Sequence, residues 1–187
     1  DRAIADWLRA SEKNRAENLM IVDLLRNDLS RIALPHSVIA ADLFAVERHP
    51  TVWQMTSTIR ARARPGTSLD DVFAALFPCG SVTGAPKAKA MELIAGLETE
   101  PRGLYCGAIG LLRPGGDAVF NVAIRTVALA DGRATCGVGG GITWDSTAGD
   151  EYAEAMLKAR FLDAASAPGG DSPPGLFETL RLENGEY

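Results

Sequence analysis

Histidine and cysteine are scarce in this chain of 187 residues. The only histidines are His36 and His49, which excludes a metal site built from several histidines and argues against catalysis that depends on histidine. The three cysteines are Cys79, Cys106 and Cys136; their number is odd, and no pair has the spacing of a metal-binding motif. Reduced thiols in a cytoplasmic enzyme are the simplest interpretation.

Long apolar runs and an excess of basic residues are also lacking. No run reaches the roughly 18 apolar residues of a membrane-spanning helix, so we expect no membrane span. The formal net charge is −5, and no basic cluster suggests a groove for nucleic acid. The hydrophobic fraction of 47% is ordinary for a globular protein, and the length suffices for one domain with a sizeable core.

Apolar spacing predicts a mixture of helices and strands. We expect helices over four ranges: residue 1 to about Asn27, 69–77, 86–97 and about 149–165. We expect strands on both sides of His49-Pro50 within 37–63, and then over 104–112, 118–129 and 133–143. The sequences between the last three strands are typical of hairpin turns, and Ser68 is placed to cap the second helix. The first helix has no clear cap, which suggests that a further part precedes it.

The composition changes near the end of the chain. Residues 166–175 are rich in Pro, Gly and Ser and read as a flexible linker. We therefore predict one unit over 1–165. Residues 176–187 begin a new strand-and-turn pattern that is too short to fold alone, as expected for the truncated start of a second unit.

The residues best suited to ligand chemistry lie in 137–160. A glycine-rich strand end, GVGGGI, leads into a helix whose first turn is acidic. Glu151, Glu154 and Lys158 are spaced i, i+3 and i+7 and therefore share one face of that helix. Carboxylates suit a hard cation and a lysine suits an anionic group, although an ordinary solvated helix face would show the same pattern.

Three further residues have both a structural and a functional interpretation. Glu17 is either a solvated helix carboxylate or a metal ligand. Arg125 stands in the otherwise apolar sequence FNVAIRTV, where an arginine needs an anionic partner: either an acid of the protein or a carboxylate of a substrate. Tyr105 is either a core aromatic or a hydrogen-bond donor to a ligand.

Several longer motifs resemble the family of chorismate-utilising enzymes, which includes anthranilate, aminodeoxychorismate, isochorismate and salicylate synthases. They follow one another in unbroken order between residue 1 and about 165: ENLMIVDLLRND, FPCGSVTGAPKAKAMELI, YCGAIG, FNVAIRT, GVGGGI and DEYAEAMLK. The resemblance implies an α+β fold in which antiparallel sheets pack face to face with helices outside. This chain would hold the C-terminal portion of that fold.

The resemblance also implies roles for individual residues. Glu17 and Glu154 match two glutamates that bind Mg²⁺, and Glu151 matches an acidic residue that acts through metal-bound water. The implied substrate-binding positions are Tyr105, Arg125, Gly139, Gly141 and Lys158. This set is physically consistent, because Mg²⁺ takes few protein carboxylates and leaves room for substrate oxygens and water.

Two positions separate members of the family. Gln54, in TVWQMTST, stands where anthranilate synthases carry a histidine, and Asn14 stands where many members have an acid. TVWQMTST is similar to component I of aminodeoxychorismate synthases. That similarity implies conversion of chorismate and ammonia to 4-amino-4-deoxychorismate for p-aminobenzoate and folate synthesis. Anthranilate synthase component I and a non-catalytic fragment that binds chorismate or a partner are the alternatives.

Further expectations concern the two ends of the chain. The SPERF-like and PIKGT-like segments of the family, which supply an acid and a lysine nucleophile, are expected upstream, so we assign no catalytic residue here and expect this portion alone to be inactive. The final LFETLRLENGEY resembles the first strand of aminodeoxychorismate lyase. A glutamine amidotransferase is the implied source of ammonia. An incomplete sheet exposes apolar edges, which favours self-association.

Overall fold

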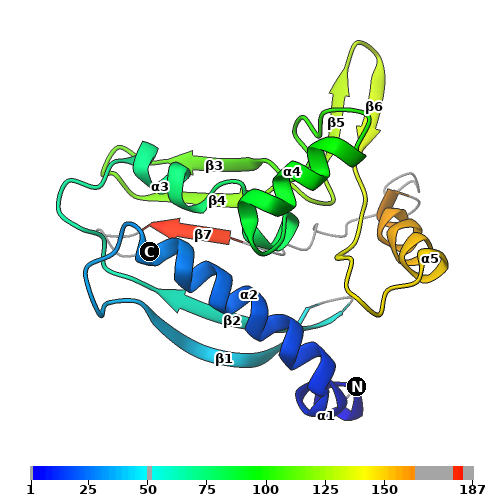
Figure 1. Cartoon of the computed structure of the whole chain (residues 1–187), viewed down its shortest axis with the longest axis horizontal. Helices are drawn as coiled ribbons and strands as arrows, with labels where there is room; N and C mark the ends of the chain where they lie inside the picture. The colour runs from blue at the N-terminus through cyan, green and yellow to red at the C-terminus, as the bar shows by residue number, and fades with distance from the viewer. Residues whose placement is uncertain (1, 50–51, 163–178, 183–187) are drawn as a thin grey trace.

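The computed structural model describes residues 2–49, 52–162 and 179–182, and Figure 1 labels its elements. The helices within these residues are α1 (Arg2–Ala10), α2 (Glu12–Ser30), α3 (Leu69–Leu76), the 3-10 helix η1 (Gly80–Val82), α4 (Lys87–Leu97) and α5 (Ala148–Ala159). The strands are β1 (Ile39–Arg48), β2 (Trp53–Arg60), β3 (Ala108–Leu112), β4 (Ala118–Val122), β5 (Val127–Ala130), β6 (Arg133–Cys136) and β7 (Thr179–Leu182). Every pairing among these strands is antiparallel, and the predicted α+β class is confirmed.

The first predicted helix is in fact two helices, because Ser11 interrupts it. The Ser11 hydroxyl accepts hydrogen bonds from the backbone N–H of Asn14 at 3.4 Å and from the Asn14 side-chain amide at 2.8 Å. A serine that satisfies free N–H groups in this way caps the start of a helix. A new helix, α2, therefore begins at Glu12, and it continues to Ser30 rather than ending near Asn27.

The strands β1 and β2, which the sequence predicts on either side of His49-Pro50, pair as an antiparallel hairpin, and a side-chain bridge fixes the hairpin to α2. A bulge between Ala41 and Ala45 interrupts the pairing of the two strands. Within the bulge, the backbone N–H of Phe44 donates to the Ser57 hydroxyl at 3.0 Å. Ser57 in turn donates to the side-chain oxygen of Asn18 at 2.6 Å. The N-terminal half of α2, which carries Glu17, is thereby held against the hairpin.

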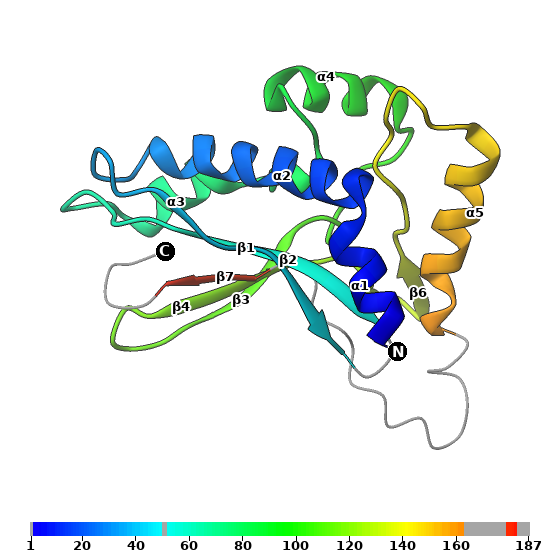
Figure 2. The same cartoon turned by 90° about the horizontal axis from the view of Figure 1, so that it is seen from below.

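A small apolar core lies where α2 and α3 cover the same side of this hairpin (Figure 2). Its buried side chains come from α2, from the residues that follow α2 and β2, and from α3: Leu29, Ile32, Ala33, Ala61, Val72 and Ala75. The partly buried Leu76 packs against both halves of this core. Burying one aliphatic side chain contributes about 1.5–3 kcal/mol, so this cluster is the main source of stability in the first half of the chain.

A buried ion pair ties α4 to α2. The Lys87 ammonium, at the first position of α4, lies 2.5 Å from the Asp28 carboxylate, and the two side chains are 16% and 4% exposed. The predicted helix over 86–97 thus begins at Lys87, with Pro86 as the residue before it. Ser68 caps α3 in a reciprocal arrangement with Asp71, as its position in the sequence predicts.

The predicted strands of the second half are shorter than expected. The strand predicted over 104–112 begins only at Ala108, because Gly103 and Cys106 form a turn with positive φ. The strand predicted over 118–129 is divided after Val122 into β4 and β5, and Arg125 lies between them with a φ of 48°. The strand predicted over 133–143 ends at Cys136, where the glycine-rich segment with low strand propensity begins.

The hairpin turns that the sequence predicts are present, and β7 adds a third strand to one hairpin. β3, β4 and β7 form one sheet in that order, and β5 pairs with β6. β7 belongs to the segment that the sequence assigns to a second unit, yet it pairs with β4. The predicted linker, 166–175, lies outside the described residues, so the division into units stays a prediction.

The last predicted helix is α5, which stands apart from the core (Figures 1 and 2). It is described over Ala148–Ala159, and the end predicted near residue 165 lies beyond the described residues. No helix in the described part of the chain combines the length and apolar character needed to cross a bilayer.

Candidate functional site

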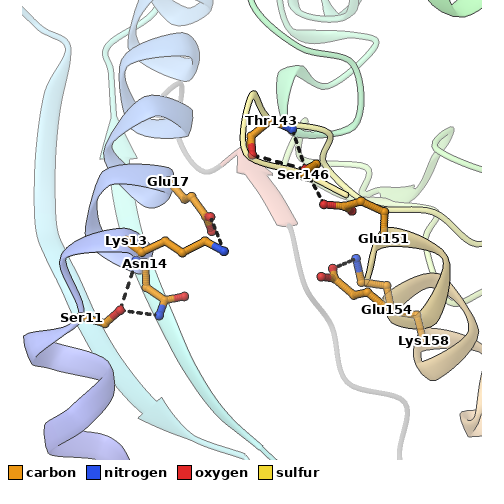
Figure 3. Close-up of polar contacts among 9 residues, drawn as sticks. All are labelled: Ser11, Lys13, Asn14, Glu17, Thr143, Ser146, Glu151, Glu154 and Lys158. Atoms are coloured by element: carbon orange, nitrogen blue, oxygen red, sulfur yellow. Dashed lines mark hydrogen bonds and ion pairs between the residues drawn. The ribbon is translucent and has the colours of Figure 1, made fainter. Parts of the chain in front are cut away.

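Polar contacts hold the junction between the glycine-rich segment and α5. Thr147 caps α5, since its hydroxyl accepts from the N–H of Asp150 at 3.3 Å and donates to the Asp150 carboxylate at 2.7 Å. The Ser146 hydroxyl donates to the Glu151 carboxylate at 2.5 Å and accepts from the N–H of Thr143 at 3.0 Å. Figure 3 shows that Glu151 is thereby turned back toward this junction.

The side chains of Glu151, Glu154 and Lys158 meet at Gly140, as their spacing on one helix face predicts. A Cβ atom at Gly140 would lie 2.9 Å from a Glu151 oxygen, 3.8 Å from a Glu154 oxygen and 3.9 Å from the Lys158 nitrogen. Lys158 pairs with Glu154 at 2.7 Å and donates to the Gly139 carbonyl at 3.0 Å. Gly140 is not among the predicted site residues. Its position in the middle of three glycines is the signal that could have identified it, because glycine allows such close approach.

Tyr105 contacts the same glycine-rich segment from the turn before β3. Its ring lies so close to Gly137 that a Cβ there would come within 2.3 Å of a ring carbon, and its hydroxyl would be 2.9 Å from a Cβ at Gly139. The residue is half-buried, and this burial raises the pKa of Tyr105 to about 12. The hydroxyl therefore keeps its proton at neutral pH and can act as a hydrogen-bond donor.

Two of the predicted substrate-binding residues lie in more open positions. Arg125 is exposed in the irregular stretch between β4 and β5, and partial desolvation of its guanidinium lowers its pKa. A Cβ at Gly141 would meet nothing within 4 Å in the described part of the chain. The roles of both residues stay predictions.

Glu17 projects from α2 toward α5. Figure 3 shows Lys13 and Glu17 on one side and Glu154 and Lys158 on the other. Glu17 lies 3.8 Å from the Lys13 ammonium, and its side chain is 49% exposed. Both interpretations of Glu17 remain compatible with this position, because an exposed carboxylate that faces two other carboxylates can be solvated or can hold a cation.

The carboxylates of Glu17, Glu151 and Glu154 match Mg²⁺ in chemistry but are not gathered around one point. Among the described residues, no three His, Cys, Asp or Glu side chains lie close enough together to hold a metal ion. Each carboxylate instead interacts with a neighbouring cation or hydroxyl of its own helix or turn. Oxygen ligands of this kind are the ones that Mg²⁺ prefers. These three carboxylates therefore have the chemistry that suits Mg²⁺, while their coming together around one ion stays a prediction.

The two positions that distinguish family members have clear surroundings. Gln54 lies on β2, partly buried and opposite Glu47 of β1. Asn14 donates its side-chain amide to the hydroxyl of Ser11, the residue that caps α2, and an acid could not make this bond because a carboxylate has no N–H to donate.

A hollow of about 490 Å³ adjoins Tyr105 on the side of α4. Its lining includes Met91 and Ile94 of α4, Thr83 after η1, and Arg102 from the loop before β3. Tyr105 itself lines this hollow, together with both polar and apolar side chains.

Comparison with known proteins identifies a family and similar enzymes. A family of enzymes described as "chorismate binding enzyme" matches residues 1–164. Aminodeoxychorismate synthase component 1 from Salmonella typhimurium is 48% identical over 84% of this chain and 35% of its own length. Anthranilate synthase component 1 from Saccharomyces cerevisiae is 45% identical over 84% of this chain and 31% of its own length.

A solved structure shows the same fold. Anthranilate synthase component I from Streptococcus pneumoniae matches with a TM-score of 0.81 and 44% identity, over 86% of this chain and 37% of the other. The chain therefore spans about a third of the length of these three proteins.

Proposed function

The chain belongs to the family of chorismate binding enzymes, and on that premise we propose that it is part of an aminodeoxychorismate synthase component I. The reaction would convert chorismate and ammonia to 4-amino-4-deoxychorismate, a step toward p-aminobenzoate and folate. The observation that carries the proposal is the meeting of separate motifs at one place. Tyr105 lies far from residues 137–159 in sequence, yet it contacts the same glycine-rich segment that the acidic face of α5 contacts.

The substrate would be held through its two carboxylates. Lys158 already presents its ammonium to the glycine-rich segment, where it donates to the Gly139 carbonyl. The protonated hydroxyl of Tyr105 lies beside the same glycine and can donate to a carboxylate. Arg125 would add a second cation with two parallel donors, and the open space at Gly141 would admit the ligand close to the backbone.

Glu17 and Glu154 would hold Mg²⁺ directly, and Glu151 would act through a metal-bound water. When bound, the ion neutralises carboxylate charge at the substrate. Lys158 would then exchange one partner, Glu154, for another, a carboxylate of the substrate. It neutralises Glu154 in the structure as described, and it would turn to a substrate carboxylate when Glu154 contacts the ion. The chain thus keeps its charges paired both with and without ligand.

The ammonia, the catalytic acid and the lysine nucleophile would come from elsewhere. A glutamine amidotransferase is the proposed source of ammonia, and the two catalytic groups would lie in further parts of the full-length protein. Cys79, Cys106 and Cys136 form no disulfide in the described residues, and a cytoplasmic location is part of the same proposal.

Anthranilate synthase component I is the second candidate, because proteins of that name are 44–45% identical to the chain. Gln54 favours the first candidate. The direct test is to incubate the full-length protein with chorismate, ammonia and Mg²⁺ and to identify the product. We expect 4-amino-4-deoxychorismate; anthranilate would establish the second candidate instead.

A calorimetric titration separates both enzymes from a non-catalytic binding role and tests the metal assignment. Glu154→Gln in the full-length protein should weaken Mg²⁺-dependent chorismate binding by about tenfold or more, since a charged ligand to the ion is lost. Glu92→Gln is the matched control, because Glu92 also pairs with a lysine on a helix surface, at 2.8 Å from Lys89. Equal affinities for the two variants would disprove the role of Glu154. Magnesium-dependent binding without any turnover would support the non-catalytic alternative.

A further inference from the structure

Arg102, in the loop between α4 and β3, joins two neighbouring parts of the chain through its guanidinium. Its Nε donates to the two Glu98 oxygens at 3.1 and 2.9 Å, and its Nη2 donates to one of them at 2.7 Å. Its Nη1 donates to the Val82 carbonyl at 2.7 Å. The planar guanidinium thus holds the end of α4 and the end of η1 at the same time, which a lysine ammonium cannot do in this geometry.

The same residue bears on Tyr105 in two ways. Its guanidinium carbon lies 5.9 Å from the centre of the Tyr105 ring, within the range of a cation–π contact. Its backbone carbonyl accepts a hydrogen bond from the Tyr105 N–H at 3.0 Å. Both the side chain and the backbone of Arg102 therefore restrict where the ring can lie.

Packing alone leaves the Tyr105 ring room to move. The ring borders the hollow of about 490 Å³, and Arg102 and Glu98 line the same hollow. On another side the ring touches Gly137, which offers no side chain to hold it. A ring that borders open volume depends on its remaining contacts, which include the Arg102 guanidinium, the neighbouring Cys106 side chain and the glycine backbone.

The other contacts of this network reach the second half of the proposed site. Val82 ends η1, and a Cβ at Gly80 in η1 would lie 2.2 Å from a side-chain carbon of Leu24 in α2, so the two elements pack tightly. The helix α2 carries Glu17. Arg102 therefore links the glycine-rich segment, through Tyr105, to the helix on which the other predicted metal ligand lies.

From these contacts we propose that Arg102 is a positioning residue that places the Tyr105 hydroxyl at the substrate site, with Glu98 fixing the orientation of its guanidinium. The inference rests on the proposed function, in which Tyr105 contacts the substrate. Arg102 itself touches no substrate in this account. Its effect on the reaction passes through Tyr105, and this makes it separable from a general structural role.

The test uses steady-state kinetics of the full-length protein with chorismate, ammonia and Mg²⁺. Arg102→Lys keeps the positive charge but loses the planar guanidinium that bonds Glu98 and Val82 at the same time. We therefore expect KM for chorismate to rise about tenfold while kcat changes less than about twofold. Arg26→Lys is the matched control, because Arg26 makes an exposed ion pair with Asp23 at 2.9 Å, and it should leave both constants unchanged. Glu98→Gln should act in the same direction as Arg102→Lys but more weakly, and it serves as the second variant if Arg102→Lys does not fold.

A double-mutant cycle with Tyr105→Phe decides whether Arg102 positions the Tyr105 hydroxyl or has only a general structural role. Tyr105→Phe should itself raise KM, and adding Arg102→Lys to it should change KM by less than about twofold, since the hydroxyl to be placed is gone. Equal effects of Arg102→Lys in the Tyr and Phe backgrounds, or no effect in either, would overturn the positioning role. If Tyr105→Phe leaves KM unchanged, the substrate contact of Tyr105 fails as well. If wild-type protein makes no 4-amino-4-deoxychorismate, the proposed function fails.

Discussion

The packed layer, formed by α2, β1, β2 and α3, and the polar segment, formed by residues 137–159, are held together by different forces. The packed layer buries aliphatic side chains between two helices and a hairpin. In the described helix α5 of the polar segment, no residue is buried, and Trp144 just before it is 99% exposed. Hydrogen bonds, ion pairs and close approach to glycine hold the polar segment instead.

This difference separates stability from ligand chemistry. A buried aliphatic side chain contributes to the free energy of unfolding, whereas an exposed ion pair contributes little and leaves its charges available to a ligand. Substitutions in the packed layer should therefore change stability first. Substitutions in the polar segment should change binding with little effect on stability.

The largest loss of stability is expected from Lys87→Met, at the point where α4 meets the packed layer. The substitution would leave the Asp28 carboxylate, in a residue only 3% exposed, without its cation. Removing one partner of a buried pair costs about 3–5 kcal/mol, and denaturant unfolding of the full-length protein would measure this. Lys89→Met, which removes an exposed pair two residues later, should cost less than about 0.5 kcal/mol. Similar losses for the two variants would contradict the account.

A pair of leucines tests the packing of the layer. Leu29→Ala removes a side chain that is 4% exposed, and we expect a loss of about 3 kcal/mol. Leu129, in β5, is 79% exposed, and Leu129→Ala should stay within about 0.5 kcal/mol of wild type. Thermal or denaturant unfolding of both variants gives the comparison, and it fails if the exposed position proves as sensitive as the buried one.

The contrast between the two regions also explains which predictions from the sequence are confirmed. The α2–β1–β2–α3 order follows from apolar periodicity and from Ser68 as a cap, because these signals are local. The predicted single helix does not include the break at Ser11, although serine is a capping residue and Ala10 is the one apolar residue in the surrounding RASEKNR. The strands predicted around Arg125 and after Cys136 are longer than the observed ones, since positive φ at Arg125 and the low strand propensity of glycine outweigh the apolar pattern.

Only part of the candidate site is predictable from the sequence, because only some of its contacts are local. The shared face of Glu151, Glu154 and Lys158 follows from helix geometry alone. The contact of Tyr105 with Gly137 and Gly139 depends on how distant segments pack, and no spacing in the sequence indicates it. Arg102 is missed because its contact with the Val82 carbonyl, twenty residues earlier, depends on packing; its partner Glu98, four residues earlier, is local in sequence.

Acid should affect the contact that supports Tyr105. The hydrogen bonds and charge of Arg102 lower the pKa of Glu98 from its usual 4.5. Because the folded-state pKa is the lower one, this contribution to stability is present above about pH 4.5 and is lost as the pH falls through the folded-state pKa. The difference in unfolding free energy between wild type and Glu98→Gln should thus be present at pH 7 and shrink as the pH falls below 4.5. A difference that is constant with pH, or equally large for Glu92→Gln, would contradict this.

A small change in stability but a clear change in binding is expected at Gly140. Gly140→Ala would place a methyl group 2.9 Å from a Glu151 oxygen, at the end of a flexible side chain that can shift, so we expect less than about 1 kcal/mol of destabilisation. Chorismate affinity in the presence of Mg²⁺ should nevertheless fall, because the shifted carboxylate belongs to the site. Gly149→Ala, where the added methyl group meets nothing within 4 Å in the described residues, should leave the affinity unchanged. Equal affinities for the two variants would show that the meeting point at Gly140 has no part in binding.

The central claim is that the two regions meet on one metal ion, with Glu17 from the packed layer and Glu154 from the polar segment as its ligands. The most direct test is an anomalous-scattering map from crystals of the full-length protein grown with Mn²⁺, in place of Mg²⁺, and chorismate. The account predicts one peak within about 2.3 Å of carboxylate oxygens from both Glu17 and Glu154, with a chorismate carboxylate on the same ion. A metal bound without either glutamate, or chorismate bound away from Lys158 and Tyr105, would contradict it.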